Sequence, residues 1–179
     1  QCVGSIAAGQ TIAAIEKLFG KKIHLVRAMP NTPALVGEAM SALSPNDAVT
    51  EEELAEVKAL FESFGKAEIV PERLMDAVIG VSGSSPAYVY LFIEAMADAA
   101  VADGMPRAQA YKFAAQSVLG AAKMVLATGQ HPGELKDAVC SPGGTTIEGV
   151  AALEEAGLRR AVIAGQRACV KKSKEMSEQ

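Results

Sequence analysis

The chain has 179 residues, of which half are apolar, 21% are charged and only 4% are aromatic, and its formal net charge is −4. This length suits one ordinary domain or two small ones, with ample apolar side chains for a core. Basic residues never cluster beyond pairs such as Lys21-Lys22. Because a nucleic-acid surface needs a basic face, we expect no nucleic-acid partner.

The three cysteines, Cys2, Cys140 and Cys169, are far apart and indicate neither a disulfide framework nor a metal site. We therefore expect no metal and a reducing, cytoplasmic location. The longest apolar stretch, residues 86–102, contains two acidic residues. Because a charge is costly at the centre of a bilayer, this stretch predicts a buried helix, and we expect no membrane association.

The first residues predict a buried strand that ends near residue 6 and turns through Ala7-Ala8-Gly9 into a helix. That helix is expected at residues 11–19, with Thr11 as its N-cap and Gly20 as its stop. A strand of a parallel sheet needs neighbours on both sides. We therefore expect this chain to be the later part of a longer protein.

Strand and helix patterns alternate through residues 1–71. Further strands are expected at residues 23–28, 39–43 and 67–70. A helix is expected at residues 50–64, where Thr50 is a good N-cap and three glutamates occupy the positive first turn. Alternating strands and helices predict the α/β class, here a partial doubly wound parallel sheet.

From residue 72 onward the strand patterns disappear, and residues 72–179 are predicted to be all-helical. Helices are expected at residues 72–78, 86–103, 106–128, 134–139, 145–155 and 158–176. A glycine-rich break is expected at residues 80–85. The helices are rich in Ala and Gly, and so much apolar surface on so few helices predicts burial against a second copy of the chain.

The strongest candidate site is a Ser-Pro-Gly-Gly-Thr-Thr segment between two expected helices. Gly143 and Gly144 leave backbone N–H groups unobstructed, and the next helix presents its own free N–H groups and positive dipole end. Such a site favours an anion, and a carboxylate fits it. Ser141, Thr145 and Thr146 add hydroxyl groups. The alternative is a tight turn in which Thr145 only caps the next helix.

A second candidate site follows the strand expected at residues 23–28. It consists of Met29, Pro30, Asn31, Thr32 and Pro33. In open α/β sheets ligands bind just beyond such strand ends. The small residues Ala7 and Ala8 occupy the equivalent end of the preceding strand, where a flat ring could approach the backbone. The alternative is a proline-rich connection that binds nothing.

Two further features are weaker candidates. The glycine-flanked serines at residues 82–86 do not match the GxSxG nucleophile motif. Neither histidine is in a promising place, since His24 is expected within a strand and His131 in a loop beside Pro132. A Ser-His hydrolase is therefore not expected. Glu72 is a lone carboxylate at the junction of the two regions, where a solvated residue without a function is the alternative.

Together, five segments resemble pyrroline-5-carboxylate reductases. They are Ser-Ile-Ala-Ala-Gly at residues 5–9, Arg-Ala-Met-Pro-Asn-Thr-Pro-Ala-Leu-Val at 27–36, Gly-Val-Ser-Gly-Ser-Ser-Pro-Ala-Tyr at 80–88, His-Pro-Gly-Glu-Leu-Lys-Asp at 131–137 and Ser-Pro-Gly-Gly-Thr-Thr-Ile at 141–147. The resemblance implies that residues 1–71 are the later part of a dinucleotide-binding Rossmann domain. It implies that residues 72–179 bind the substrate and form a homodimer, with higher oligomers left open.

The resemblance also implies an activity, the NAD(P)H-dependent reduction of 1-pyrroline-5-carboxylate to L-proline in proline biosynthesis. The substrate-binding residues it implies are Glu72, Ser141, Gly143, Gly144, Thr145 and Thr146, with Thr146 as the catalytic residue facing the ring nitrogen. The cofactor-binding residues it implies are Ile6, Ala7, Ala8, Met29, Pro30, Asn31 and Thr32. The cofactor is expected to be NADPH, with NADH left open.

The sequence departs from the family pattern in two ways. The glycine fingerprint that holds the dinucleotide pyrophosphate is absent from these residues, so they are expected to be inactive alone. Some relatives carry Asn at the position of Ala138. Two alternatives remain open. One is a related imine reductase or β-hydroxyacid dehydrogenase, although Lys123 lacks the glycine-rich setting of the catalytic lysine of β-hydroxyacid dehydrogenases. The other is a catalytically silent helical dimerisation module.

Overall fold

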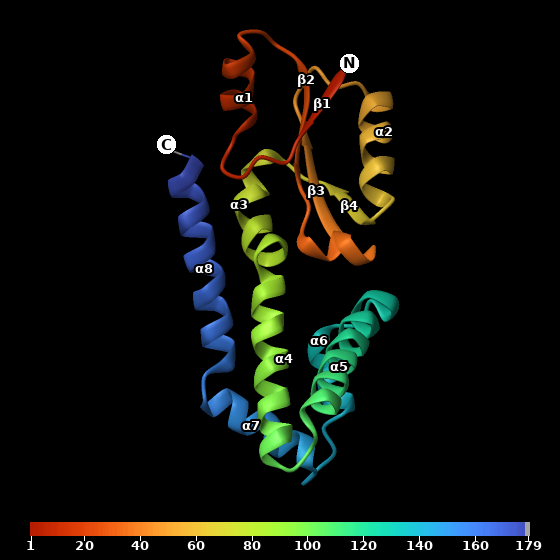
Figure 1. The fold of residues 1–179 in the computed structure, drawn as a ribbon, viewed down its shortest axis with the longest axis vertical. Helices are drawn as coiled ribbons and strands as arrows, with labels where there is room; N and C mark the ends of the chain where they lie inside the picture. Colours follow the sequence, from red (N-terminus) through yellow and green to blue (C-terminus); the bar gives the residue numbers. More distant parts are fainter. Residues whose placement is uncertain (178–179) are drawn as a thin grey trace. The chain divides into compact units, whose positions relative to one another are not determined.

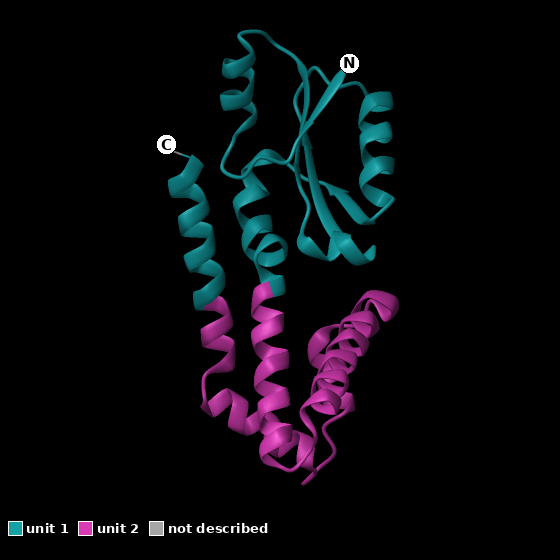
Figure 2. Cartoon of the chain, in the orientation of Figure 1, with its two compact units in different colours: residues 1–86, 164–179 teal, residues 87–163 magenta. Residues whose placement is uncertain are grey.

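The computed structural model describes residues 1–177, and the chain divides into two compact units (Figure 2). Unit 1 comprises Gln1–Pro86 together with the C-terminal segment from Ala164. Unit 2 comprises Ala87–Ile163. Among the helices of residues 1–177, none is long and apolar enough to cross a membrane.

Unit 1 is built on a four-stranded sheet with the order β1-β2-β3-β4 (Figure 1). The strands are β1 (Cys2–Ser5), β2 (His24–Met29), β3 (Ala39–Pro45) and β4 (Gly65–Ile69). The pairs β1–β2 and β3–β4 are parallel, whereas β2 and β3 are antiparallel. The α/β class is confirmed, but the sheet is mixed. A parallel crossover needs about a dozen residues or more, and residues 30–38 are too few.

Helices α1 (Ile12–Phe19) and α2 (Glu51–Glu62) flank the sheet on opposite sides (Figure 1). Both begin where their N-caps predict. The Thr11 hydroxyl accepts a hydrogen bond from the Ala14 N–H at 3.1 Å. Thr50 and Glu53 form a reciprocal capping box. The pKa of Glu53 is lowered, mainly by the hydrogen bond that its carboxylate accepts from the Thr50 N–H and next by its contact with His24.

The core of unit 1 covers both faces of the sheet. On the α2 side, Val26, Leu43 and Phe61 are among the buried residues. Leu25 and Arg27 alternate with Val26 along β2, so their side chains point to the opposite face. Arg27 is only 3% exposed. A buried guanidinium needs a partner, which Glu72 supplies as described below.

Residues 72–102 are helical except for a bend at Ser84, which differs from the glycine-rich break expected at residues 80–85. A 3-10 helix (Glu72–Leu74) leads into α3 (Met75–Val78), a π-helix (Ile79–Gly83) and α4 (Ser85–Ala102). Gly80 is buried, and a Cβ there would lie 3.0 Å from side-chain carbons of Gln166 and Val170. The glycine therefore permits close packing with the last helix and does not end this one.

Unit 2 is entirely helical in its described residues. It contains most of α4, the complete helices α5 (Arg107–Thr128), α6 (Pro132–Ala138) and α7 (Thr145–Glu155), and the beginning of α8 (Leu158–Ser177). Only Ala110 and Ala114 are buried in α5. The expectation of a helical region after the sheet is confirmed. Little of its apolar surface is covered within a single chain.

Candidate functional site

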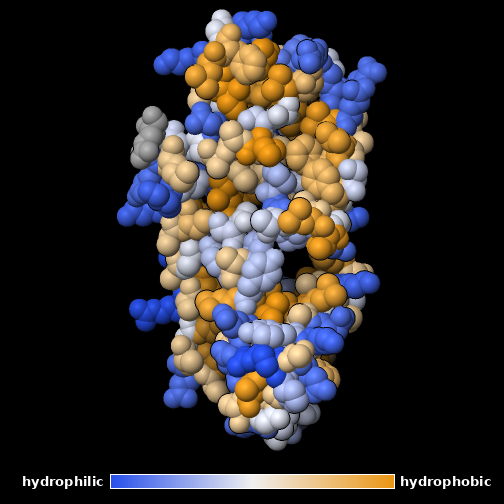
Figure 3. Space-filling view, in the orientation of Figure 1, coloured by the Kyte–Doolittle hydropathy of each residue, from blue (hydrophilic) through white to orange (hydrophobic). Residues whose placement is uncertain are grey.

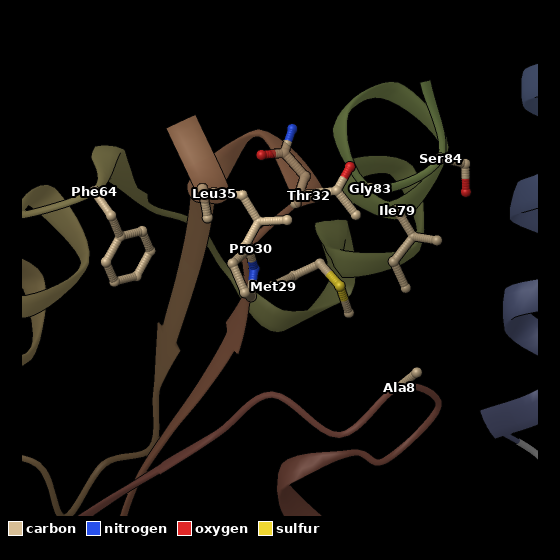
Figure 4. A pocket seen from close by; sticks show the side chains of 11 residues that line it. Ala8, Met29, Pro30, Thr32, Leu35, Phe64, Ile79, Gly83 and Ser84 are labelled. Carbon is tan, nitrogen blue, oxygen red and sulfur yellow. The ribbon is translucent and has the colours of Figure 1, made fainter. Parts of the chain in front are cut away.

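A cavity of about 740 Å³ opens at one edge of the sheet in unit 1 (Figure 4). At this edge β1 and β2 end and β3 and β4 begin, as their pairing requires. The cavity is lined by Ala8, Met29, Pro30, Asn31, Thr32, Ala34, Leu35, Phe64, Ile79, Gly83 and Ser84. This position, beyond the carboxyl ends of parallel strands, is where open α/β sheets bind ligands.

Five of the residues that the resemblance implied for the cofactor lie together on this cavity: Ala8, Met29, Pro30, Asn31 and Thr32. Ile6 and Ala7 are exposed and do not line it. The lining is mostly apolar, and the small side chain of Ala8 lies at one border (Figure 4). The cavity can therefore accept a flat, weakly polar ring.

Sequence reasoning missed two parts of the cavity lining. Ile79, Gly83 and Ser84 come from the π-helix and the residue after it. Phe64, which precedes β4, lies on the other side of Met29 and Pro30 (Figure 4). The glycine-flanked serines belong to a segment that resembles the family, but neither that resemblance nor the nucleophile motif assigns them to the cofactor site. Ser84 Oγ instead lies 2.9 Å from Cys169 Sγ. Only the contact with α8, which is distant in sequence, reveals this arrangement.

Glu72 is engaged by two partners in unit 1. Its Oε1 accepts a hydrogen bond from the Ile12 N–H at 2.8 Å and one from Arg27 Nη1 at 2.9 Å. The Arg27 side chain is 4% exposed and that of Glu72 is 34% exposed. Glu72 therefore neutralises a buried charge and holds the first turn of α1, so it is not a solvated junction residue. The part that the resemblance implied for it in substrate binding stays a prediction.

The Ser-Pro-Gly-Gly-Thr-Thr segment leads into α7 in unit 2, and its two threonines are the first residues of that helix. Gly143 has φ +66°, a conformation that glycine adopts without strain. Gly144 is the N-cap of α7, and within residues 1–177 no side chain caps this helix. A Cβ at Gly144 would overlap Ser141 Oγ. The alternative in which Thr145 caps α7 is therefore wrong, and the first N–H groups of α7 lack a side-chain acceptor.

Other chemistry has little support in the described part of the chain. It holds no group of three or more His, Cys, Asp or Glu side chains that could bind a metal ion. His131 caps α6 by accepting a hydrogen bond from the Gly133 N–H at 3.0 Å. His24 contacts Glu53 at 2.6 Å. Both histidines therefore have local structural partners.

Comparison with known proteins gives consistent matches. A family model described as "Pyrroline-5-carboxylate reductase dimerisation" matches residues 72–176. Pyrroline-5-carboxylate reductase of Escherichia coli K12 is 59% identical over 176 residues, which are 98% of this chain and 65% of that protein. The Pisum sativum enzyme is 47% identical over 97% of this chain and 63% of its own length. The chain thus spans somewhat less than two thirds of these curated relatives.

Solved structures give the same result. A Plasmodium falciparum pyrroline carboxylate reductase with NADP bound superposes with a TM-score of 0.93 at 36% identity, covering 99% of this chain and 71% of that one. A pyrroline-5-carboxylate reductase from Coxiella burnetii superposes with a TM-score of 0.94 at 37% identity, covering 99% and 66%. The similarity therefore includes both the sheet and the helices that follow it.

Proposed function

Since the chain belongs to the pyrroline-5-carboxylate reductase family, we propose that the protein reduces 1-pyrroline-5-carboxylate to L-proline with NADPH. In this proposal residues 1–71 are the later part of the dinucleotide-binding domain, and residues 72–179 bind the substrate and form the dimer. The other reductase classes have no comparable support. We also propose a reducing, cytoplasmic location, to which three widely spaced cysteines are suited.

The observation that carries the proposal is the N-terminus of α7. Its first N–H groups follow a glycine pair and, among the residues that the structure describes, have no side-chain cap, so they suit a carboxylate. Ser141 and Thr146 add hydroxyl groups at this helix end. The substrate is a small ring with one carboxylate and one C=N bond, and it needs one anion site and one hydrogen-bonding group beside the nitrogen.

The cavity at the sheet edge suits the nicotinamide half of the dinucleotide. Its volume of about 740 Å³ and its mostly apolar lining fit a flat ring and the adjoining sugar. When bound, NADPH supplies the hydride that reduces the imine. The chain's own contribution is to hold and orient the substrate, and positioning of this kind supplies much of the rate enhancement in such reactions.

The direct test measures L-proline formation by the whole protein that contains residues 1–179. We expect proline to form from 1-pyrroline-5-carboxylate at the expense of NADPH, with NADH as the comparison cofactor. Absence of proline under conditions in which the protein is folded and dimeric would overturn the proposed activity. Reduction of other cyclic imines in preference to this one would favour the imine-reductase alternative.

Thr146→Ala is expected to lower kcat without weakening NADPH binding. Loss of a hydrogen bond to a reacting group costs about 1–3 kcal/mol, which is roughly ten- to a hundredfold in turnover. Thr146→Ser keeps the hydroxyl group and serves as the matched control. Steady-state kinetics and NADPH titration measure the two effects. An unchanged kcat in Thr146→Ala would remove this hydroxyl from the mechanism.

We further propose that a second copy of the chain covers the exposed apolar surface of unit 2. Figure 3 shows apolar side chains reaching the surface in view. Leu91, Phe113 and Leu119 are 67%, 66% and 55% exposed in the single chain. The family model that matches residues 72–176 is described by dimerisation, which supports this partner. An obligate interface buries about 2,000 Å² or more.

Sedimentation is expected to give the mass of a dimer at micromolar concentration. Leu119→Glu should shift the protein toward monomer, because it places a charge in the middle of α5. The control is Leu18→Glu on α1 in unit 1, where the leucine is 79% exposed, and this variant should stay dimeric. A folded wild-type monomer, or equal effects of the two variants, would contradict the proposed interface.

A further inference from the structure

We propose that Asn31 is a positioning residue that fixes the distance between the two walls of the cavity, and that it thereby sets the affinity for the nicotinamide half of NADPH. This inference rests on the proposed function. One wall begins at Met29, the last residue of β2, and includes Thr32, and the other includes Ile79 and Ser84 (Figure 4). The Asn31 carboxamide contacts both the second wall and the beginning of β3.

The contacts of Asn31 define the orientation of its carboxamide. Its Oδ1 accepts a hydrogen bond from the Met40 N–H at 3.0 Å. Its Nδ2 donates to the Ser82 carbonyl at 3.1 Å. A backbone N–H can only donate and a carbonyl can only accept, so the two ends of the carboxamide are not interchangeable. Both contacts are made to backbone atoms, and Ser82 is far from Asn31 in the sequence.

The Ser82 carbonyl lies where the π-helix passes into α4. An α-helical bond to this carbonyl would come from residue 86, which is a proline and has no N–H. Asn31 supplies a donor to this carbonyl. Ser82 Oγ adds a weaker link by donating to the Met40 carbonyl at 3.3 Å. Asn31, Met40 and Ser82 thus form one network that joins β3, the segment after β2 and the π-helix.

The chain offers a matched control in a second bridging asparagine. Asn46 accepts from the Leu25 N–H at 3.2 Å and donates to the Ile23 carbonyl at 2.7 Å. Asn46 directly follows β3, so it lies at one end of the β2–β3 pair and Asn31 lies at the other end. Asn46 does not line the cavity. Removing its carboxamide should lower stability. It should leave the cavity walls in place.

The test compares Asn31→Ala and Asn46→Ala in the whole protein, well below both melting temperatures. We expect Asn31→Ala to raise the Kd and KM for NADPH about tenfold, with the KM for pyrroline-5-carboxylate within about twofold of wild type. Asn46→Ala should lower the melting temperature at least as much as Asn31→Ala does, and it should leave the NADPH affinity unchanged. Equal NADPH affinities of wild type and Asn31→Ala would overturn the inference, as would equal losses in the two variants.

Asn31→Asp gives a second readout that a general loss of stability would not produce. At neutral pH the new carboxylate faces the Ser82 carbonyl and cannot donate, so NADPH binding should weaken. A protonated carboxyl group has a donor and an acceptor again, so the affinity relative to wild type should recover as the pH falls. A pH-independent ratio would contradict the inference. A wild-type protein that binds no NADPH would instead overturn the proposed function itself.

Discussion

Replacing Glu72 by Ala is expected to lower the free energy of unfolding by about 3 kcal/mol. Removing one member of a buried ion pair typically costs about 3–5 kcal/mol, because the other charge is left without a partner. The lower value applies because the Glu72 side chain is itself 34% exposed. The variant also removes the acceptor for the Ile12 N–H. Chemical denaturation of the wild type and the variant measures the difference.

Two further variants separate the buried charge from a general effect of losing a glutamate. Glu62 pairs with Lys58 at 3.4 Å, and both side chains are well exposed. Glu62→Ala should therefore cost only about 0.5 kcal/mol. Adding Arg27→Met to Glu72→Ala should restore much of the lost stability, because no unpaired buried charge remains. Similar losses in Glu72→Ala and Glu62→Ala would show that the Arg27 pair contributes little.

Gly65→Ala is expected to destabilise the chain by about 3 kcal/mol. Gly65 begins β4 and pairs with Ala39 of β3. A Cβ at this position would lie 2.7 Å from the Ala39 carbonyl carbon and closer still to its nitrogen and oxygen. Since these are backbone atoms, the two strands would have to separate where they border the cavity. Thermal and chemical denaturation measure the loss.

Gly149→Ala is the control for this substitution. It adds the same methyl group within α7, where a Cβ would meet nothing within 4 Å. An alanine in a helix is about 0.5–1 kcal/mol more stable than a glycine, so this variant should gain stability slightly. If Gly65→Ala also left stability unchanged or raised it slightly, the close approach of β3 and β4 would not be the reason for a glycine at position 65.

Local signals in the sequence predicted the parts of the fold that depend on neighbouring residues. Thr11 and Thr50 cap α1 and α2 as expected, because a cap acts within one helical turn. The segments that end β1 and β2 were also predicted to meet, and Ala8 and Met29 line one cavity. In a parallel pair both strand ends lie at the same edge.

Long-range contacts explain what the sequence did not predict. Gly80 has the pattern of a helix break, yet it packs against Gln166 and Val170, which are far away along the chain. Glu72 has the pattern of a solvated residue, yet it pairs with Arg27, buried on another element. Asn31 was assigned to the cofactor by resemblance, and its backbone partners were not foreseen. No local pattern identifies such partners.

The π-helix at Ile79–Gly83 also indicates where the gene can change in length. The Ser84 N–H reaches back to the Ile79 carbonyl at 2.8 Å, so this turn holds one residue more than an α-helical turn. A one-codon deletion within this turn would leave Ser84 four residues after Ile79, which is one regular α-helical turn. Ser84 and the helix after it would therefore keep nearly the same orientation about the helix axis. The same deletion within α4 would rotate every later side chain of that helix by about 100°, so descendants should tolerate the loss of one residue better in this turn than in α4.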